Sequence, residues 1–218
     1  MRTRVKICCI GSAAEVRAAV MAGADAVGVV GAMPSGPGPV DDDTARAVVA
    51  EAPPGVGAFL LTSEVQPDAI IDHVLRIAAP VVQIVRHVDP ASHALLRAAA
   101  PWVKIVQVVH VEDETSLELA RGYSRSADCL LLDSGRPEAE VAELGGTGRR
   151  HDWSLSRRIV SLVDKPVYLA GGLNEFNVGE AIEVVRPFGV DLCSGVRTMG
   201  KLDIRKLSGF FAAVKLAH

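Results

Sequence analysis

The chain alternates between short aliphatic runs, rich in β-branched residues, and longer stretches with helical spacing. The runs predicted to be strands are 5–8, 26–30, 57–61, 81–85, 103–108, 129–133, 167–170 and 190–193. The stretches predicted to be helices are 13–22, 42–51, 67–78, 91–99, 113–121, 155–163, 176–185 and 203–216. This repetition over 218 residues predicts an α/β fold, a single (β/α)₈ TIM barrel domain over residues 1–218. A doubly wound sheet is the alternative, although it more often has roughly five to seven strands.

Composition agrees with a barrel and restricts the partners. Apolar residues make up 49% of the chain but aromatic residues only 4%, so aliphatic side chains must form the core, as in parallel sheets covered by helices. A net charge of −3 argues against a nucleic-acid surface. The N-terminus is too short and too charged for a signal peptide, and the apolar runs are too short to cross a bilayer. We therefore expect a cytoplasmic protein with neither a membrane nor a nucleic-acid partner.

The cysteines are Cys8, Cys9, Cys129 and Cys193. Their spacing fits neither a disulfide framework nor a zinc site, which predicts a reducing compartment and no bound metal. Side chains alternate along a strand, so Cys8 shares a face with Lys6 while Cys9 is expected to pack outward under the helices.

Two glycine-containing loops follow the last two predicted strands. "LAGGLN" contains Gly171 and Gly172, and "CSGV" contains Ser194 and Gly195. Each loop leaves backbone N–H groups bare near a helix start, where they favour an anion. Barrels often bind phosphate after strands seven and eight, so these loops predict a phosphate site rather than two ordinary turns.

Two further residues end predicted strands and have reactive side chains. Asp133 closes "CLLLD" and is a candidate general acid, metal ligand or helix cap. Cys8 closes the first strand beside Lys6. A buried cysteine is often only a small hydrophobe, but a neighbouring ammonium makes its thiolate more accessible.

In order and spacing, "KIC" at 6–8, "LLLDS", "GGTGRRHDW", "LAGGLN" and "DLCSGV" resemble the phosphoribosylanthranilate isomerase family. The resemblance covers about residues 4–215. It implies an aldose–ketose isomerase of tryptophan biosynthesis that performs an Amadori rearrangement, converting an N-substituted 5-phosphoribosylamine into the aminoketose without metal or cofactor. The partner is then a small phosphorylated sugar amine. The family contains monomers and homodimers, so either state is expected.

The resemblance also implies roles for particular residues. Asp133 would be the general acid that opens the sugar ring, and Cys8 the general base that removes a proton from sugar C2. Burial should raise the pKa of Asp133, and the nearby cation should lower that of Cys8. The remaining substrate-binding candidates are Lys6, Gln83, Arg86, Arg197, Gly146 and Thr147.

Several positions depart from the family pattern. Where the family has an arginine that holds the anthranilate carboxylate, this chain keeps Ser35 but has Pro37 and Gly38. The other departures are Val85–Arg86 for His-Gly, Cys9 for glycine, Cys193 for serine and Arg197 for glutamate.

Three interpretations of these departures remain. In the first, Arg86 or Arg197 supplies the carboxylate clamp and the substrate is unchanged, with Arg86 favoured. In the second, the chain is a paralogue that isomerises a different N-substituted phosphoribosylamine. In the third, it is a non-catalytic phosphosugar-binding barrel, although the retained Cys8 and Asp133 argue against this.

Overall fold

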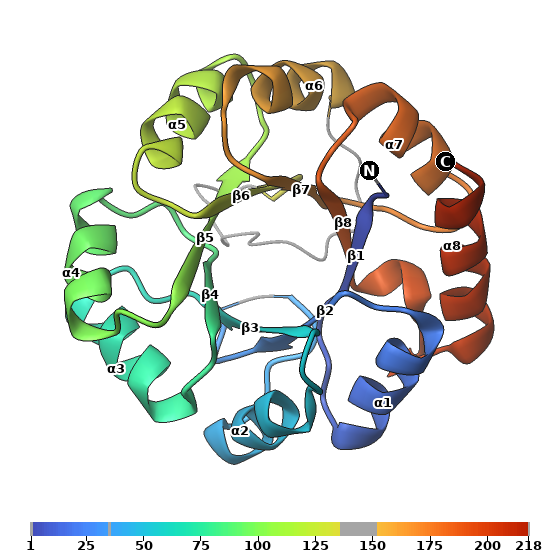
Figure 1. Ribbon diagram of the computed structural model, residues 1–218, viewed down its shortest axis with the longest axis horizontal. Coiled ribbons are helices and arrows are strands. Elements are labelled where there is room, and N and C mark those ends of the chain that lie inside the picture. The colour runs from blue at the N-terminus through green and yellow to red at the C-terminus, as the bar shows by residue number, and fades with distance from the viewer. Residues whose placement is uncertain (1, 35, 136–151, 218) are drawn as a thin grey trace.

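The computed structural model describes residues 2–34, 36–135 and 152–217 and shows parallel strands closed into a barrel inside a ring of helices (Figure 1). The strands are β1 (Arg4–Ile7), β2 (Ala26–Val30), β3 (Gly57–Thr62), β4 (Val81–Ile84), β5 (Lys104–His110), β6 (Cys129–Asp133), β7 (Val167–Leu169) and β8 (Gly189–Leu192). Each strand pairs with the next, and β1 also pairs with β8. This closure confirms the barrel and excludes the open, doubly wound sheet.

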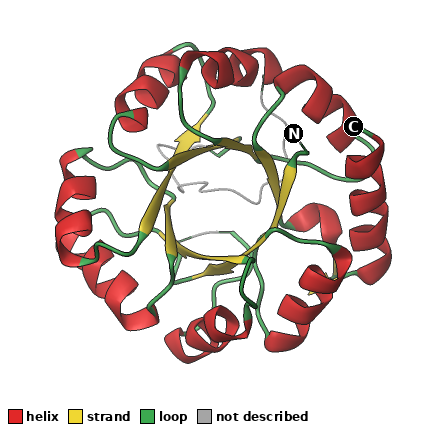
Figure 2. Cartoon of the chain, viewed as in Figure 1, coloured by secondary structure: helices red, strands yellow, loops and turns green. Residues whose placement is uncertain are grey.

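The helices lie outside the strands, as the colouring by secondary structure makes clear (Figure 2). They are α1 (Ala13–Ala22), α2 (Asp42–Glu51), α3 (Pro67–Ile77), α4 (Ala91–Ala99), α5 (Thr115–Ser124), α6 (Trp153–Leu162), α7 (Val178–Val185) and α8 (Ile204–Leu216). Side-chain caps fix several starts: the Ser12 hydroxyl accepts from the Glu15 N–H, and the Asp41 carboxylate accepts from the Thr44 N–H. In the described part of the chain, no helix is both long and apolar enough to cross a membrane.

Strand alternation divides the buried side chains into two layers. One face of the strands, including Ile7, Leu60 and Ile105, packs beneath the helices. The other fills the barrel interior, including Val106 and Leu131. Both layers are mainly aliphatic, as the composition predicts.

The sequence did not predict the structure that follows β8. A short 3₁₀ helix, η1 (Ser194–Val196), leads into a two-stranded hairpin of β9 (Arg197–Thr198) and β10 (Lys201–Leu202). These elements have two or three residues each, too few to show a period.

The environment of Cys9 corrects two sequence predictions. Strand β1 ends at Ile7, and Cys9 has a left-handed φ of 60°, so strand alternation no longer decides which way Cys9 points. Its side chain belongs to the inner cluster rather than packing under the helices, and it forms a disulfide with Cys193. The pairing was missed because the two cysteines are 184 residues apart and meet only through the closure of β1 on β8.

Candidate active site

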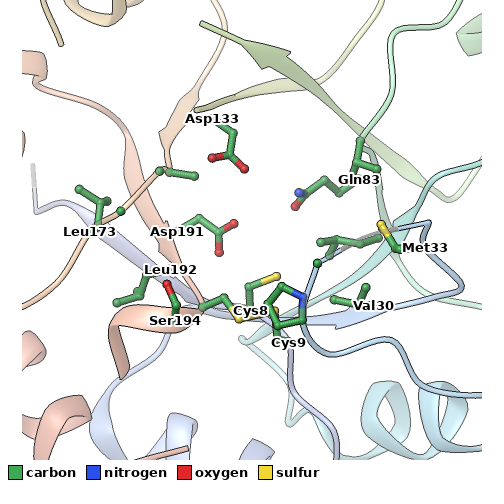
Figure 3. Close-up of a pocket in the computed structure, with 18 residues that line it drawn as sticks. Cys8, Cys9, Val30, Met33, Gln83, Asp133, Leu173, Asp191, Leu192 and Ser194 are labelled. Atoms are coloured by element: carbon green, nitrogen blue, oxygen red, sulfur yellow. A yellow bond between two sulfur atoms is a disulfide. The ribbon is translucent and has the colours of Figure 1, made fainter. Parts of the chain in front are cut away.

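A cavity open to solvent lies where the carboxyl ends of the strands converge. Figure 3 shows Asp133, Asp191 and Gln83 around it, with Cys8 at the side nearest Cys9 and Ser194. Six predicted site residues line it: Cys8, Gln83, Asp133, Gly171, Gly172 and Ser194. The structure thus brings together residues from five different strand ends.

Cys8 lies beside a buried ion pair. Lys6 and Asp191 are register partners on β1 and β8, and their Nζ and Oδ2 atoms are 2.9 Å apart. A Cβ on Gly28 would come within 3.1 Å of both the Cys8 sulfur and Lys6 Nζ, so this glycine leaves the space that the two side chains occupy.

The thiol of Cys8 is protonated at neutral pH. Burial is the largest influence and raises its pKa to about 11, Lys6 opposes this rise, and Asp191 adds to it. The expectation of a lowered pKa is therefore wrong, because desolvation outweighs the attraction of the single ammonium.

The pKa of Asp133 is raised, as its place in the barrel mouth predicts. Burial raises it to about 6, and the negative charge of Asp191 adds to this effect. The Ser134 N–H donates to Asp133 Oδ1 at 2.7 Å and opposes the rise by stabilising the carboxylate. At pH 7 a carboxyl with this pKa holds its proton in about a tenth of the molecules, and in that form it can act as an acid.

The two glycine-containing loops lie side by side. A Cβ on Gly195 would come within 2.0 Å of the Leu173 carbonyl oxygen, so only glycine fits this approach. Gly171 and Gly172 have φ values of 87° and 65°, and the Asn177 side chain donates to the Gly172 carbonyl. Within the described residues, no backbone carbonyl accepts from the N–H groups of Gly171, Gly172, Ser194 or Gly195. These donors suit an anion.

The other candidates lie outside this lining. Lys6 is fully buried below Cys8 and paired with Asp191. Arg197 donates to Glu15 and to the Cys9 carbonyl. Arg86 directly follows the lining residue Val85, and its carbonyl accepts from Gln107. Gly146 and Thr147, like Ser35, lie outside the described residues. Among described residues, no lysine or arginine lines the cavity.

Sequence reasoning missed Asp191, the first residue of the "DLCSGV" motif. Its signal was its place at the end of a strand that must pair with the strand of Lys6. Two buried acceptor atoms at the cavity, Asp191 Oδ1 and Gln83 Oε1, have no hydrogen-bond partner among the described residues. Such atoms favour a ligand that donates hydrogen bonds. The described residues contain no group of three or more His, Cys, Asp or Glu side chains placed to hold a metal ion.

The whole chain resembles proteins of one enzyme family. A family model described as N-(5'phosphoribosyl)anthranilate (PRA) isomerase matches residues 5–213. An N-(5'-phosphoribosyl)anthranilate isomerase of Methanocella arvoryzae is 35% identical over 98% of this chain and 99% of its own. One from Halobacterium salinarum is 39% identical over 96% and 94%, respectively. A crystal structure of such an isomerase with reduced 1-(o-carboxyphenylamino)-1-deoxyribulose 5-phosphate superposes with a TM-score of 0.78 at 32% identity, covering 98% of both chains.

Proposed function

The chain belongs to the N-(5'-phosphoribosyl)anthranilate isomerase family, and we propose that it isomerises phosphoribosylanthranilate using Asp133 as the acid and Cys8 as the base. One observation carries the assignment of roles: a carboxyl with a pKa of about 6 and a buried thiol line one cavity beside two anion-accepting loops. The reaction converts an aldose to a ketose and belongs to tryptophan biosynthesis. This role supports a cytoplasmic location.

The phosphate of the substrate anchors the sugar. The N–H groups of Gly171, Gly172, Ser194 and Gly195 donate to its oxygens, and the loops need no side-chain cation for this. Anchoring at one end fixes where the sugar ring lies, so that its reacting atoms stay near the acid and the base.

Ring opening comes first. Asp133 donates its proton to the ring oxygen as the bond from that oxygen to C1 breaks, and the nitrogen lone pair forms a C1=N double bond. Cys8, as the thiolate, then removes the proton from C2. The electrons of that C–H bond form a C1=C2 double bond, and those of C1=N return to nitrogen. The resulting enol-amine becomes the aminoketose when C1 gains a proton and the C2 hydroxyl loses one.

Lys6 and Asp191 support these steps from below. The Lys6 ammonium favours the thiolate of Cys8 by charge. Asp191 Oδ1 and Gln83 Oε1 lack partners among the described residues and accept hydrogen bonds from hydroxyl or amine groups of the bound sugar. Cys8 and Asp133 are the proposed catalytic residues, and Lys6 is a positioning residue.

Recognition of the anthranilate carboxylate is assigned to Arg86. The loop after β2 presents Gly36 and Pro37 to the cavity and brings no cation there. Arg86 is the described arginine closest in sequence to the lining, one residue after Val85. Its side chain is long and only partly buried, so rotation about its bonds can bring the guanidinium to the cavity rim.

Genetic complementation tests this function. A bacterial strain that lacks its own phosphoribosylanthranilate isomerase requires tryptophan for growth. The gene for this chain should restore growth without tryptophan, whereas genes carrying Cys8→Ser or Asp133→Asn should not. Failure of the unchanged gene, with the protein present in the cells, would contradict the proposal.

A further inference from the structure

The disulfide between Cys9 and Cys193 joins the two loops that frame the candidate active site. Cys9 directly follows Cys8, and Cys193 directly precedes Ser194 of the anion-accepting loop. Their Cα atoms are 5.8 Å apart, and both residues line the cavity. The crosslink therefore joins the residue after the proposed base to the residue before the proposed phosphate loop.

The backbone at Cys9 makes this cysteine an unexpected residue for its position. Its φ of 60° lies in the left-handed region, which side chains other than those of glycine, asparagine and aspartate adopt rarely. A Cβ on Gly38 would come within 2.6 Å of the Cys9 Cβ, so the loop after β2 packs closely against it. This backbone and the close packing of the loop after β2 fix the position of the Cys9 side chain that reaches Cys193.

A second set of contacts joins the same two segments without the disulfide, because Arg197 lies three residues beyond Ser194 and binds the backbone at Cys9. Arg197 Nη2 donates to the Cys9 carbonyl at 2.5 Å, and Arg197 also pairs with Glu15. Glu15 in turn accepts from the N–H groups of Gly11 and Leu202. Reduction of the disulfide leaves these contacts in place. It removes the covalent link of Cys193 and Ser194 to β1.

We propose that Cys9 and Cys193 form a site of thiol–disulfide exchange that controls the affinity of the phosphate loop. The inference rests on the proposed function for its link to catalysis. In the oxidised protein the crosslink holds Ser194 and Gly195 in the arrangement that receives the phosphate. In the reduced protein Ser194 and Gly195 must become ordered when the anion binds, and this ordering lowers the affinity for the anion.

The exchange is a two-electron reaction with a dithiol, either a small molecule or a dithiol protein. One dithiol sulfur, as its thiolate, attacks Cys193, which is more exposed than Cys9, and the Cys9–Cys193 bond breaks. The second dithiol sulfur then displaces Cys193 from the mixed disulfide. Cys9 and Cys193 gain two electrons and two protons, and the dithiol becomes a disulfide. In a reducing compartment such a bond is of the transient, regulatory kind.

The disulfide and the contacts of Arg197 together predict which kinetic parameter changes on reduction. Without the crosslink, Ser194 and Gly195 are restrained less, although Arg197 three residues on still contacts Cys9, so the dissociation constant of inorganic phosphate and the KM should both rise, by about three- to tenfold. The β1 side remains held by Arg197, so Cys8 keeps its place and kcat should stay within about a factor of two. A merely structural crosslink would instead change kcat and stability while leaving phosphate affinity unchanged.

The experiment compares the whole protein in its two states. Thiols are counted after denaturation: two, from Cys8 and Cys129, are expected in the oxidised state and four in the state reduced by dithiothreitol. The affinity for inorganic phosphate is then measured by calorimetry in each state, followed by kcat and KM with phosphoribosylanthranilate. Weaker phosphate binding in the reduced state, with unchanged kcat, supports the inference.

Variants provide the controls. The double variant Cys9→Ser/Cys193→Ser should bind phosphate like the reduced protein whether or not dithiothreitol is present, whereas Cys129→Ser should respond like the unchanged protein. Equal phosphate affinity in two states with different thiol counts would overturn the inference, as would four thiols after equilibration with oxidised dithiothreitol. A redox-dependent phosphate affinity without turnover in either state would refute the isomerase function but leave the exchange site standing.

Discussion

The Lys6 ammonium and the Asp191 carboxylate lie 2.9 Å apart beneath Cys8, in a pair almost closed to solvent. The pairing of β1 with β8 places them opposite each other, so barrel closure itself creates the contact. A buried charge without its partner is far more costly than the pair. This pair therefore links the stability of the barrel to the environment of the proposed base.

The first prediction concerns that pair. Lys6→Met leaves the buried Asp191 carboxylate without its cation and should lower the free energy of unfolding by about 3–5 kcal/mol. The double variant Lys6→Met/Asp191→Leu removes both charges and should be more stable than Lys6→Met alone. Urea unfolding at neutral pH measures both. Strictly additive losses in the double variant would mean that the two residues are not coupled.

The second prediction concerns the dependence of kcat/KM on pH. The reaction needs Asp133 protonated, with a pKa of about 6, and Cys8 deprotonated, with a pKa of about 11. Below pH 6 the thiolate fraction rises about tenfold per pH unit while Asp133 stays protonated, so the rate rises. Above pH 6 the loss of protonated Asp133 cancels that rise, which gives a plateau.

Steady-state rates between pH 5 and pH 10 test this profile. Asp133→Asn is the matched control, because its residual rate should keep rising above pH 6 as Cys8 ionises. A decline of the unchanged enzyme between pH 7 and pH 9 would show that the pKa of Cys8 lies well below 11.

The third prediction concerns the phosphate loops. Gly195→Ala places a Cβ about 2.0 Å from the Leu173 carbonyl, so the two loops must separate. We expect phosphate affinity to fall by about tenfold or more, the scale of losing one or two hydrogen bonds to a charged group. Gly179→Ala in α7 is the control: a Cβ there meets no atom within 4 Å, and alanine favours a helix. Calorimetry with inorganic phosphate compares the two, and unchanged affinity in Gly195→Ala would remove this loop from the phosphate site.

The fourth prediction concerns Arg86. Arg86→Ala should raise KM for phosphoribosylanthranilate about tenfold or more, because a charge-assisted pair with the carboxylate is lost. Turnover of the analogue that lacks the carboxylate should not change. Arg121→Ala, an exposed arginine on α5, is the control. Equal losses on both substrates would assign Arg86 to the phosphate or to the fold, and no loss on either would place carboxylate recognition elsewhere.

The sequence predicted the barrel because aliphatic strand runs and helical spacing both recur visibly along the chain. Strand β2 and helix α2, for example, have the predicted bounds, since aliphatic runs and capping residues mark them locally. The alternation of side chains along a strand also predicted that Lys6 and Cys8 lie on the same face. Asp133 and Gly171 line one cavity, as predicted by the rule that barrel sites form at the carboxyl ends of strands.

What the sequence could not predict depends on contacts across the closure of the barrel. The disulfide of Cys9 with Cys193, the ion pair of Lys6 with Asp191 and the bonds of Arg197 to the loop after β1 all join residues from opposite ends of the chain. The direction of the Cys8 pKa shift was wrong for a related reason. A cation close in sequence was visible, whereas the extent of burial was not.

The most direct test of the central claim is the rate at which the protein consumes phosphoribosylanthranilate, followed by the loss of the substrate's fluorescence. The variants Cys8→Ser and Asp133→Asn are measured beside the unchanged protein. All three proteins should bind inorganic phosphate with equal affinity. We predict enzymatic turnover that falls by a factor of about 10² or more in each variant, the scale of a lost general acid or base. Near-native turnover in both variants, or no turnover by the unchanged protein, would contradict the account.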